Sequence, residues 1–201
     1  MRKILFNDKY SLTQEVLAGN KTMTRRSFAR FEPDARMFDE IYNIEGGFDD
    51  KGRWIFTLYN ENGDIIGDLI PHYKVGDIVA IAQSYKTIYA EMEDKDAAEQ
   101  FKKEYENTAG WNNKMFVKAD LLPHHIRITD IKIERLQDIS EEDALREGIE
   151  EFCFDYFLPN DYSKPFLMPR DAFAFLIDKV GKKGDWDKNP LVAAYTFELV
   201  D

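Results

Sequence analysis

The sequence is short of the residues that build disulfides and metal sites. It contains one cysteine, Cys153, and three histidines among 201 residues. A single thiol cannot form a disulfide within the chain and fits a reducing compartment, so we expect a cytoplasmic location. His124 and His125 are adjacent and would point to opposite faces of a strand, so together with His72 they make a poor zinc site. The sequence therefore predicts no metal ion and no cofactor.

Several motifs of enzymes and membrane proteins are also absent. No apolar run approaches the length of a membrane span, and residues 1–6 are too short for the apolar region of a signal peptide. The segment GNKT at residues 19–22 lacks the glycines that precede the lysine of a P-loop. The H-x-E and P-C-x-x-C pattern of zinc deaminases is missing as well. We therefore expect no membrane partner, no P-loop chemistry and no zinc-dependent deamination.

Acidic residues outnumber basic ones, and the net charge is −11. Residues 1–30 are the exception, because they hold seven lysines and arginines against two acidic residues. Broad adhesion to nucleic acid depends on the neutralisation of many phosphates, which an acidic surface opposes. The charge distribution therefore favours a small or local anionic target at the basic end over a long duplex.

Apolar residues make up 44% of the chain, enough for the core of a single domain over residues 1–201. Apolar alternation and runs predict strands at 2–6, 54–59, 64–69, 77–81, 124–136 (with a register change near Asp130) and 191–199. Asn62-Gly63 between two of them predicts a hairpin. Helical spacing predicts helices at 11–18, 91–106, 141–147 (capped by Ser140) and 170–180, and residues 151–168 are expected to form a loop. Mixed strands with helices between them predict an α+β fold, a curled sheet or a small barrel.

The most informative stretch covers residues 11–26 and predicts a short helix followed by a basic strand. Ser11 and Gln14 have the spacing of a capping box, and Gly19 suits the left-handed residue that ends a helix. The next residues, 21–26, read KTMTRR and bring a lysine, two hydroxyls and two guanidiniums together. Such a turn suits an anionic or strongly polar group. In the alternative interpretation, the same cations bind nothing and merely complement the helix dipole.

Four segments resemble the ASCH family, a branch of the PUA-like pseudobarrel domains, and in particular its longer, phage-associated members. The first, LAGNKTMTRR at 17–26, is similar to the opening G-x-K-T-x-T-x-R signature of that family. The others are GDIV at 76–79, a segment within 133–149, and WDKNP at 186–190. They occur in the order of the family over nearly the whole chain. The resemblance implies a PUA-like (ASCH) pseudobarrel of mixed strands with inserted helices, and insertions at about 31–70 and 86–120, which match poorly.

The resemblance also implies a function. ASCH domains are usually proposed to hold RNA or a nucleoside in a cleft. One branch, the bacterial N(4)-acetylcytidine amidohydrolases, is thought to work with a threonine, a lysine and a glutamate, which by motif would be Thr24, Lys21 and Glu147. Arg26 matches an arginine beside that site. Where longer members carry an Arg-Glu pair, this chain has Ala-Gln at positions 82–83, so whether it is an enzyme stays open.

Amide hydrolysis by these residues sets two conditions. A threonine hydroxyl needs a neighbouring base, and Lys21 could serve only if burial or the nearby arginines lowered the pKa of its ammonium, with Glu147 passing a proton to the leaving amine. Lys21 and Thr24 are also three positions apart, so on a regular strand they face opposite sides. They can converge only if the turn after Gly19 delays the strand or a bulge re-aims one side chain.

Three functions therefore stay open: recognition of RNA, a nucleoside or a nucleotide; deacylation of an N(4)-acetylcytidine-like nucleoside; and a non-catalytic interaction role in a mobile element. The catalytic candidates are Lys21, Thr24 and Glu147. Phosphate contacts, base-edge contacts or stacking would come from the substrate-binding candidates Thr22, Arg25, Arg26, Gln83 and Tyr85. Each also has an ordinary structural reading, such as an ion pair between Lys21 and Glu147.

Overall fold

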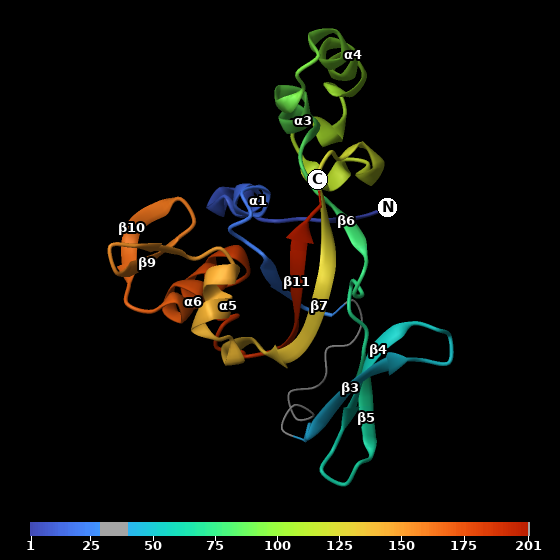
Figure 1. Cartoon of the computed structure of the whole chain (residues 1–201), viewed down its shortest axis with the longest axis vertical. Coiled ribbons are helices and arrows are strands. Elements are labelled where there is room, and N and C mark those ends of the chain that lie inside the picture. Colours follow the sequence, from blue (N-terminus) through green and yellow to red (C-terminus); the bar gives the residue numbers. More distant parts are fainter. Residues whose placement is uncertain (29–39, 201) are drawn as a thin grey trace.

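The computed structural model describes residues 1–28 and 40–200, and over these residues the protein is α+β with three sheets (Figure 1). The largest sheet has the strand order β1-β6-β7-β11-β2. β1 runs parallel to β6, and the other neighbours pair antiparallel. The strands are β1 (Arg2–Ile4), β2 (Met23–Arg26), β6 (Ile78–Ile81), β7 (His125–Arg135) and β11 (Leu191–Leu199). In this described part no sheet closes into a barrel, so the α+β class is confirmed and the pseudobarrel stays a prediction.

The two longest strands, β7 and β11, pair along the middle of this sheet. Their register shifts at one point, because Thr196 lies opposite Asp130 whereas the next residue, Phe197, lies opposite Ile128. β7 therefore carries an extra residue, Thr129, as a β-bulge. The register change that alternation predicted near Asp130 is confirmed.

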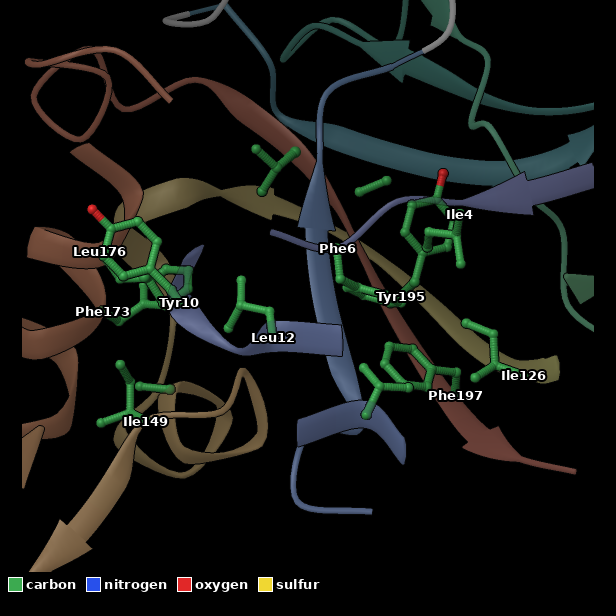
Figure 2. Close-up of a cluster of buried hydrophobic side chains, with 14 of the residues drawn as sticks. Ile4, Phe6, Tyr10, Leu12, Ile126, Ile149, Phe173, Leu176, Tyr195 and Phe197 are labelled. Carbon is green, nitrogen blue, oxygen red and sulfur yellow. The ribbon is translucent and has the colours of Figure 1, made fainter. Parts of the chain in front are cut away.

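The main hydrophobic core joins the central sheet to α1 (Leu12–Leu17), α5 (Glu141–Arg146) and α6 (Pro169–Val180) (Figure 2). α6 buries Ala172, Phe173 and Leu176, the spacing of an amphipathic helix, as predicted for residues 170–180. Tyr195 of β11 is fully buried in the same cluster. Burial of each large apolar side chain contributes about 1.5–3 kcal/mol, so this cluster fixes how the helices lie on the sheet. None of the described helices combines the length and apolarity needed to cross a bilayer.

The two regions expected to be insertions each contain a small hydrophobic cluster and extend from opposite ends of the central sheet (Figure 1). The first holds an antiparallel sheet of β3 (Asn43–Phe48), β4 (Trp54–Tyr59) and β5 (Ile65–Leu69). The hairpin predicted at Asn62-Gly63 joins β4 to β5, with Gly63 at φ 81°. Residues 31–39 of this region, and Arg30 before it, lie outside the described part.

The second of these regions is helical. It contains α3 (Tyr85–Glu91), α4 (Lys95–Tyr105) and short 3₁₀ turns at Ala109–Trp111, Lys114–Phe116 and Ala119–Leu121. The single helix expected at 91–106 was wrong at its start. Asp94 accepts hydrogen bonds from the backbone N–H groups of Asp96 and Ala97, so it caps α4 and separates it from α3.

The expected loop at 151–168 was wrong, because these residues belong mainly to a three-stranded sheet of β8 (Glu150–Phe152), β9 (Asp155–Leu158) and β10 (Asp161–Phe166). Tight turns join its strands. Cys153 and Phe154 form the first turn at φ 52° and 69°, and Asn160 lies in the second at φ 55°. Two-residue hairpin turns normally carry glycine or asparagine at such left-handed positions, so the Cys-Phe turn had no recognisable signal.

The capping box predicted for the first helix was also wrong. Ser11 precedes α1, but its φ is 51° and its side chain makes no capping hydrogen bond. A 3₁₀ turn at Asp8–Tyr10 runs directly into Ser11, and this forces the left-handed conformation there. Ser140, in contrast, caps α5 as predicted, because its hydroxyl accepts a hydrogen bond from the backbone N–H of Asp143.

Candidate functional site

A cavity of about 320 Å³ lies between the start of β2, the segment after β1 and α6. This volume falls at the lower end of the range of about 300–1,000 Å³ that is typical of small-molecule sites. Its polar lining comes from Asn7 and from five of the sequence candidates: Lys21, Thr24, Arg25, Arg26 and Glu147. Its apolar lining comes from Leu5, Phe6, Leu12, Phe173, Leu176, Ile177 and Val180.

The turn after α1 brings Lys21 and Thr24 to the same cavity. Gly19 adopts φ 78°, and the backbone N–H groups of Asn20 and Lys21 both donate to the carbonyl oxygen of Glu15, at 2.9 and 3.0 Å. β2 then begins only at Met23. Lys21 therefore precedes the strand, and the usual alternation does not separate its side chain from that of Thr24. The delayed strand that convergence required is present.

Lys21 and Glu147 form a buried ion pair. The Lys21 Nζ lies 2.5 Å from Oε2 of Glu147 and 2.7 Å from the Glu147 carbonyl oxygen. The two side chains are only 2% and 5% exposed. Glu147 is the C-cap residue that follows α5, so the amine from near the start of the chain meets a carboxylate 126 residues later. This is the structural ion pair that the sequence left open, and it also lines the cavity.

Arg25 completes the charged wall. Its Nη1 donates to Oε1 of Glu147 at 3.1 Å, so each carboxylate oxygen of Glu147 accepts from a different cation. Its Nε donates to Oε1 of Glu134 on β7 at 2.7 Å, and its Nη2 donates to Oδ2 of Asp143 on α5 at 3.0 Å. Burial works against the charge, but Glu147 and Glu134 outweigh it and raise the pKa of Arg25. Arg25 therefore ties β2 to both β7 and α5.

The pKa of Lys21 is lowered from its ordinary value. Burial is the largest cause, the carboxylate of Glu147 acts in the opposite direction, and the positive charges of Arg26 and Arg25 add to the lowering. A lysine can act as a base only if its pKa is lowered, and the pKa of Lys21 is shifted in that direction. The Lys21 ammonium donates to Glu147, so the pair can exchange a proton inside the cavity.

Arg26 differs from the two cations beside it. Its Nη2 donates to the carbonyl oxygen of Leu5 at 2.5 Å, and its guanidinium carbon lies 5.5 Å from the centre of the Phe6 ring. Its Nε is buried and has no hydrogen-bond partner, and within residues 1–28 and 40–200 no carboxylate pairs with it. Burial lowers the pKa of Arg26. The cavity wall thus contains a half-buried guanidinium whose buried Nε has unused hydrogen-bonding capacity.

Thr24 supplies a second ligand-facing group. It is 5% exposed and lies opposite Tyr195 in the pairing of β2 with β11. In the described part of the chain its hydroxyl makes no hydrogen bond with another side chain, and the residue lines the cavity. A hydroxyl can both donate and accept, so Thr24 and Arg26 together offer a polar edge to a ligand.

The comparisons with known proteins add little to this geometry. No model of a known protein family matches the chain, and a search of curated proteins finds no match. Among solved structures, the chain is similar to the crystal structure of protein EF3133 from Enterococcus faecalis V583, of the family described as DUF984. The two are 15% identical, the similarity covers 100% of this chain and 81% of the other, and the TM-score is 0.41. A similarity at this level carries no argument about fold or function.

Three of the substrate-binding candidates do not line the cavity, and a role for them in binding stays a prediction. The Thr22 hydroxyl accepts from Nε of Arg146 at 3.4 Å. Gln83 donates to the Glu91 carboxylate at 2.9 and 3.0 Å, and Tyr85 is buried in the cluster of the helical region. Gln83 and Tyr85 follow β6 in the chain, and the strand order explains why they lie far from the cavity. β6 and β2 lie on opposite sides of the β7–β11 pair.

Two acidic residues of the site were missed by sequence reasoning. Glu134 lies on a strand whose alternation suggested that its polar side chains face solvent, yet it is buried against Arg25. Glu134 meets Arg25 at 2.6 Å and Lys132 at 2.5 Å, and alternation alone does not reveal the partner from β2. Asp143 was recognised only as part of a capped helix. Across the described residues, no group of three or more His, Cys, Asp or Glu is arranged to hold a metal ion.

Proposed function

We propose that the cavity binds a nucleoside, either free or as part of an RNA. The observation that supports this best is the buried Nε of Arg26, which has no partner. A buried donor without an acceptor costs about 1–3 kcal/mol, so a ligand that supplies an acceptor is favoured. The carbonyl and ring nitrogen atoms of a base, or a phosphate oxygen, are acceptors of this kind.

The rest of the cavity suits such a ligand. Lys21 and Arg25 are neutralised by buried carboxylates, so they hold the shape of the wall and leave recognition to Arg26 and Thr24. The opposite lining is apolar, with Phe173 and Leu176 from α6. A nucleobase has apolar faces and a polar edge, so its faces suit the apolar lining and its edge suits Arg26 and Thr24. In such sites the apolar walls exclude water and a few polar groups fix the orientation of the ligand.

The ASCH resemblance supports the same reading and forms part of the proposal, including the PUA-like pseudobarrel. The residues that its motifs single out, Lys21, Thr24, Arg26 and Glu147, all line one cavity. They come from the turn and strand after α1 and from the end of α5, so their meeting depends on the fold.

Deacylation is a second candidate, favoured by the lowered pKa of Lys21 and its place beside Thr24 in the cavity. The Thr24 hydroxyl would attack the acyl carbonyl of an N(4)-acylated cytidine and give its proton to the Lys21–Glu147 pair. The carbon–nitrogen bond would break as the leaving amine takes up that proton. Water would then cleave the threonyl ester, releasing the carboxylic acid and restoring the hydroxyl.

Binding is tested by calorimetric titration of the purified protein with cytidine, N(4)-acetylcytidine and adenosine. Arg26→Met removes the unpartnered guanidinium, and we expect it to weaken binding about tenfold or more, since a hydrogen bond from a charged group contributes about 1.5–3 kcal/mol. Arg127→Met, at an exposed arginine of β7, is the matched control and should bind like the wild type. Absence of binding, or equal affinities for Arg26→Met and the wild type, would contradict the proposal.

Deacylation is tested by incubation with N(4)-acetylcytidine and chromatography of cytidine and acetate. We expect Thr24→Val to abolish turnover while it retains nucleoside binding, because the acyl acceptor is lost and the volume is kept. Thr129→Val, at the exposed bulge of β7, is the control. If the wild type yields no cytidine, the hydrolase candidate is removed and the binding function stands.

A further inference from the structure

A second concave surface lies away from the cavity, between the edge of the central sheet and the sheet of β3, β4 and β5. It consists of two adjoining hollows of about 460 Å³ each, which share Arg2, Arg53, Ile70, Pro71 and Tyr73. We call it the edge groove, because β1 is the outermost strand on that side of the central sheet. None of its lining residues also lines the cavity of Lys21 and Glu147.

The edge groove is basic although the protein as a whole is acidic. Arg2, Lys3, Arg53 and Lys74 line it, and among its described lining residues Asp77 alone is acidic. The charge of Arg2 also reaches His72 in the same groove, where burial first, and then Arg26 and Arg2, lower the pKa of the imidazole. A positive concavity on a chain of net charge −11 attracts an anionic group to this place and to few others.

Most of these cations have no carboxylate partner. Lys3 donates to the carbonyl oxygens of Lys114, Met115 and Val117, and Arg2 donates to the carbonyl oxygen of His72. Arg53 pairs with Asp49. Within residues 1–28 and 40–200, Arg2, Lys3 and Lys74 form no ion pair with a side chain. The three ammonium hydrogens of Lys3 are given to backbone carbonyl oxygens, so Arg2 and Lys74 are the cations available to a ligand.

The groove also exposes a supported aromatic ring. Phe48 is 68% exposed at the end of β3. Its ring meets Trp54 edge to face, with centroids 5.1 Å apart and planes at 77°. Trp54 in turn lies so close over β3 that a Cβ at Gly46 would stand 2.9 Å from its Cζ2, which explains the glycine there. The Phe48 ring is thus held against a rigid partner while it stays open to solvent.

We propose that the edge groove holds a single-stranded nucleic-acid segment, with a base stacked on Phe48 and phosphates next to Arg2 and Lys74. A positive groove with an exposed aromatic ring is the combination by which proteins bind single strands without reading their sequence. A duplex would offer phosphates but no free base face to Phe48. This inference does not require the cavity to bind a nucleoside.

The test is fluorescence anisotropy of the whole protein with a labelled ten-residue oligouridine and a labelled ten-residue oligothymidine, over a series of salt concentrations. We expect Phe48→Ala to weaken binding about tenfold, the effect typical of one lost base–aromatic stack. Phe154→Ala, at an aromatic residue that is 93% exposed on the sheet of β8 to β10, is the control and should bind like the wild type.

Lys74→Ala tests the phosphate contacts separately. The plot of log affinity against log salt concentration should lose about 0.7 in slope, because one phosphate contact on a single strand contributes that amount. Lys183→Ala removes an exposed lysine far along the chain and should leave the slope unchanged. If both oligonucleotides bind, the groove recognises the phosphates and pyrimidine bases that RNA and DNA strands have in common. If one binds more tightly, the groove is assigned to RNA or to DNA accordingly.

Other results would overturn the inference. One is no binding of either strand at low salt, and another is equal binding of duplex and single strand. A poly-glutamate peptide that competes as well as the oligonucleotide would assign the groove to acidic peptides. If Arg26→Met abolished oligonucleotide binding and Phe48→Ala did not, the strand would lie at the cavity, which would refute the edge groove and leave the proposed function intact.

Discussion

The cavity and the edge groove use the same kinds of cation in opposite ways. In the cavity, Lys21 and Arg25 are buried and meet carboxylates at 2.5 to 3.1 Å. In the edge groove, Arg2 and Lys74 are exposed and, within the described residues, form no side-chain ion pair, although Asp77 lines the same groove. Buried charges are tolerated only when they are paired, whereas exposed charges can stay unpaired at little cost. The first set therefore stabilises the fold, and the second set is free for a partner.

Arg26 combines the two situations. It lines the cavity with Lys21 but is only half-buried, its Nε is buried without a partner, and no described carboxylate pairs with it. A buried donor without a partner calls for an explanation, and a bound ligand is one.

Glu147→Gln should have the largest effect on stability. It removes the negative charge that Lys21 and Arg25 share, and we expect the free energy of unfolding to fall by about 3–5 kcal/mol, as for other broken buried pairs. Denaturant unfolding measures this loss. Glu142→Gln, at an exposed position of the same helix, should change it by less than about 0.5 kcal/mol. Similar losses in both variants would show that the buried pairing does not stabilise the fold.

Alkaline pH should destabilise the protein through Tyr195, a buried residue of β11 that lies opposite Thr24 of β2. Burial raises the pKa of Tyr195 to about 12. Between pH 10 and 12 the unfolded chain therefore loses this proton while the folded chain keeps it, so the free energy of unfolding falls as pH rises, by up to about 2–3 kcal/mol. Unfolding at several pH values measures the slope, and Tyr195→Phe should reduce it. An unchanged slope in the variant would contradict the assignment.

Arg26→Met should cost much less than Glu147→Gln. It removes one hydrogen bond to the Leu5 carbonyl but leaves no buried carboxylate without a partner, so we expect a loss of about 1 kcal/mol. Thermal unfolding without ligand measures it. A loss as large as that of Glu147→Gln would mean that Arg26 belongs to the structural ion-pair network, and the contrast with Arg25 would fail.

Lys74→Ala should have the smallest effect on stability. The side chain is exposed, and its removal should change the free energy of unfolding by less than about 0.5 kcal/mol while it weakens the salt dependence of oligonucleotide binding. Denaturant unfolding is again the measurement. Marked destabilisation would show that Lys74 has a structural partner and is not reserved for a ligand.

Local patterns predicted the parts of the fold that depend on near neighbours. Asn62-Gly63 indicated the hairpin of β4 and β5, and the switch in alternation near Asp130 indicated the bulge of β7. The approach of Lys21 to Thr24 followed from the left-handed Gly19, which delays β2. In each case a few adjacent residues contain the physical cause. The hairpin and the register change were therefore predicted outright, whereas for Lys21 and Thr24 the sequence predicted only the condition under which they converge.

Features that depend on distant segments could not be predicted in the same way. Gln83 was a substrate-binding candidate like Arg26, but the sheet separates β6 from β2 by two other strands. Glu134 looked like a solvent-facing residue until Arg25 was brought against it. The turn at Cys153 and Phe154 failed for a different reason, because these residue types rarely adopt positive φ and give no turn signal.

The strand order of the central sheet also determines when the cavity can exist during folding. β2 is hydrogen-bonded to β11, which ends near residue 200, and β1 pairs with β6, so the first two strands of the chain bind partners that are made much later. The sheet of β3 to β5 and the pair α3–α4 need only nearby residues and can form early, since local contacts close faster than distant ones. We therefore expect Lys21 and Arg25 to stay hydrated until β11 docks, and the cavity to be among the last features of the protein to form.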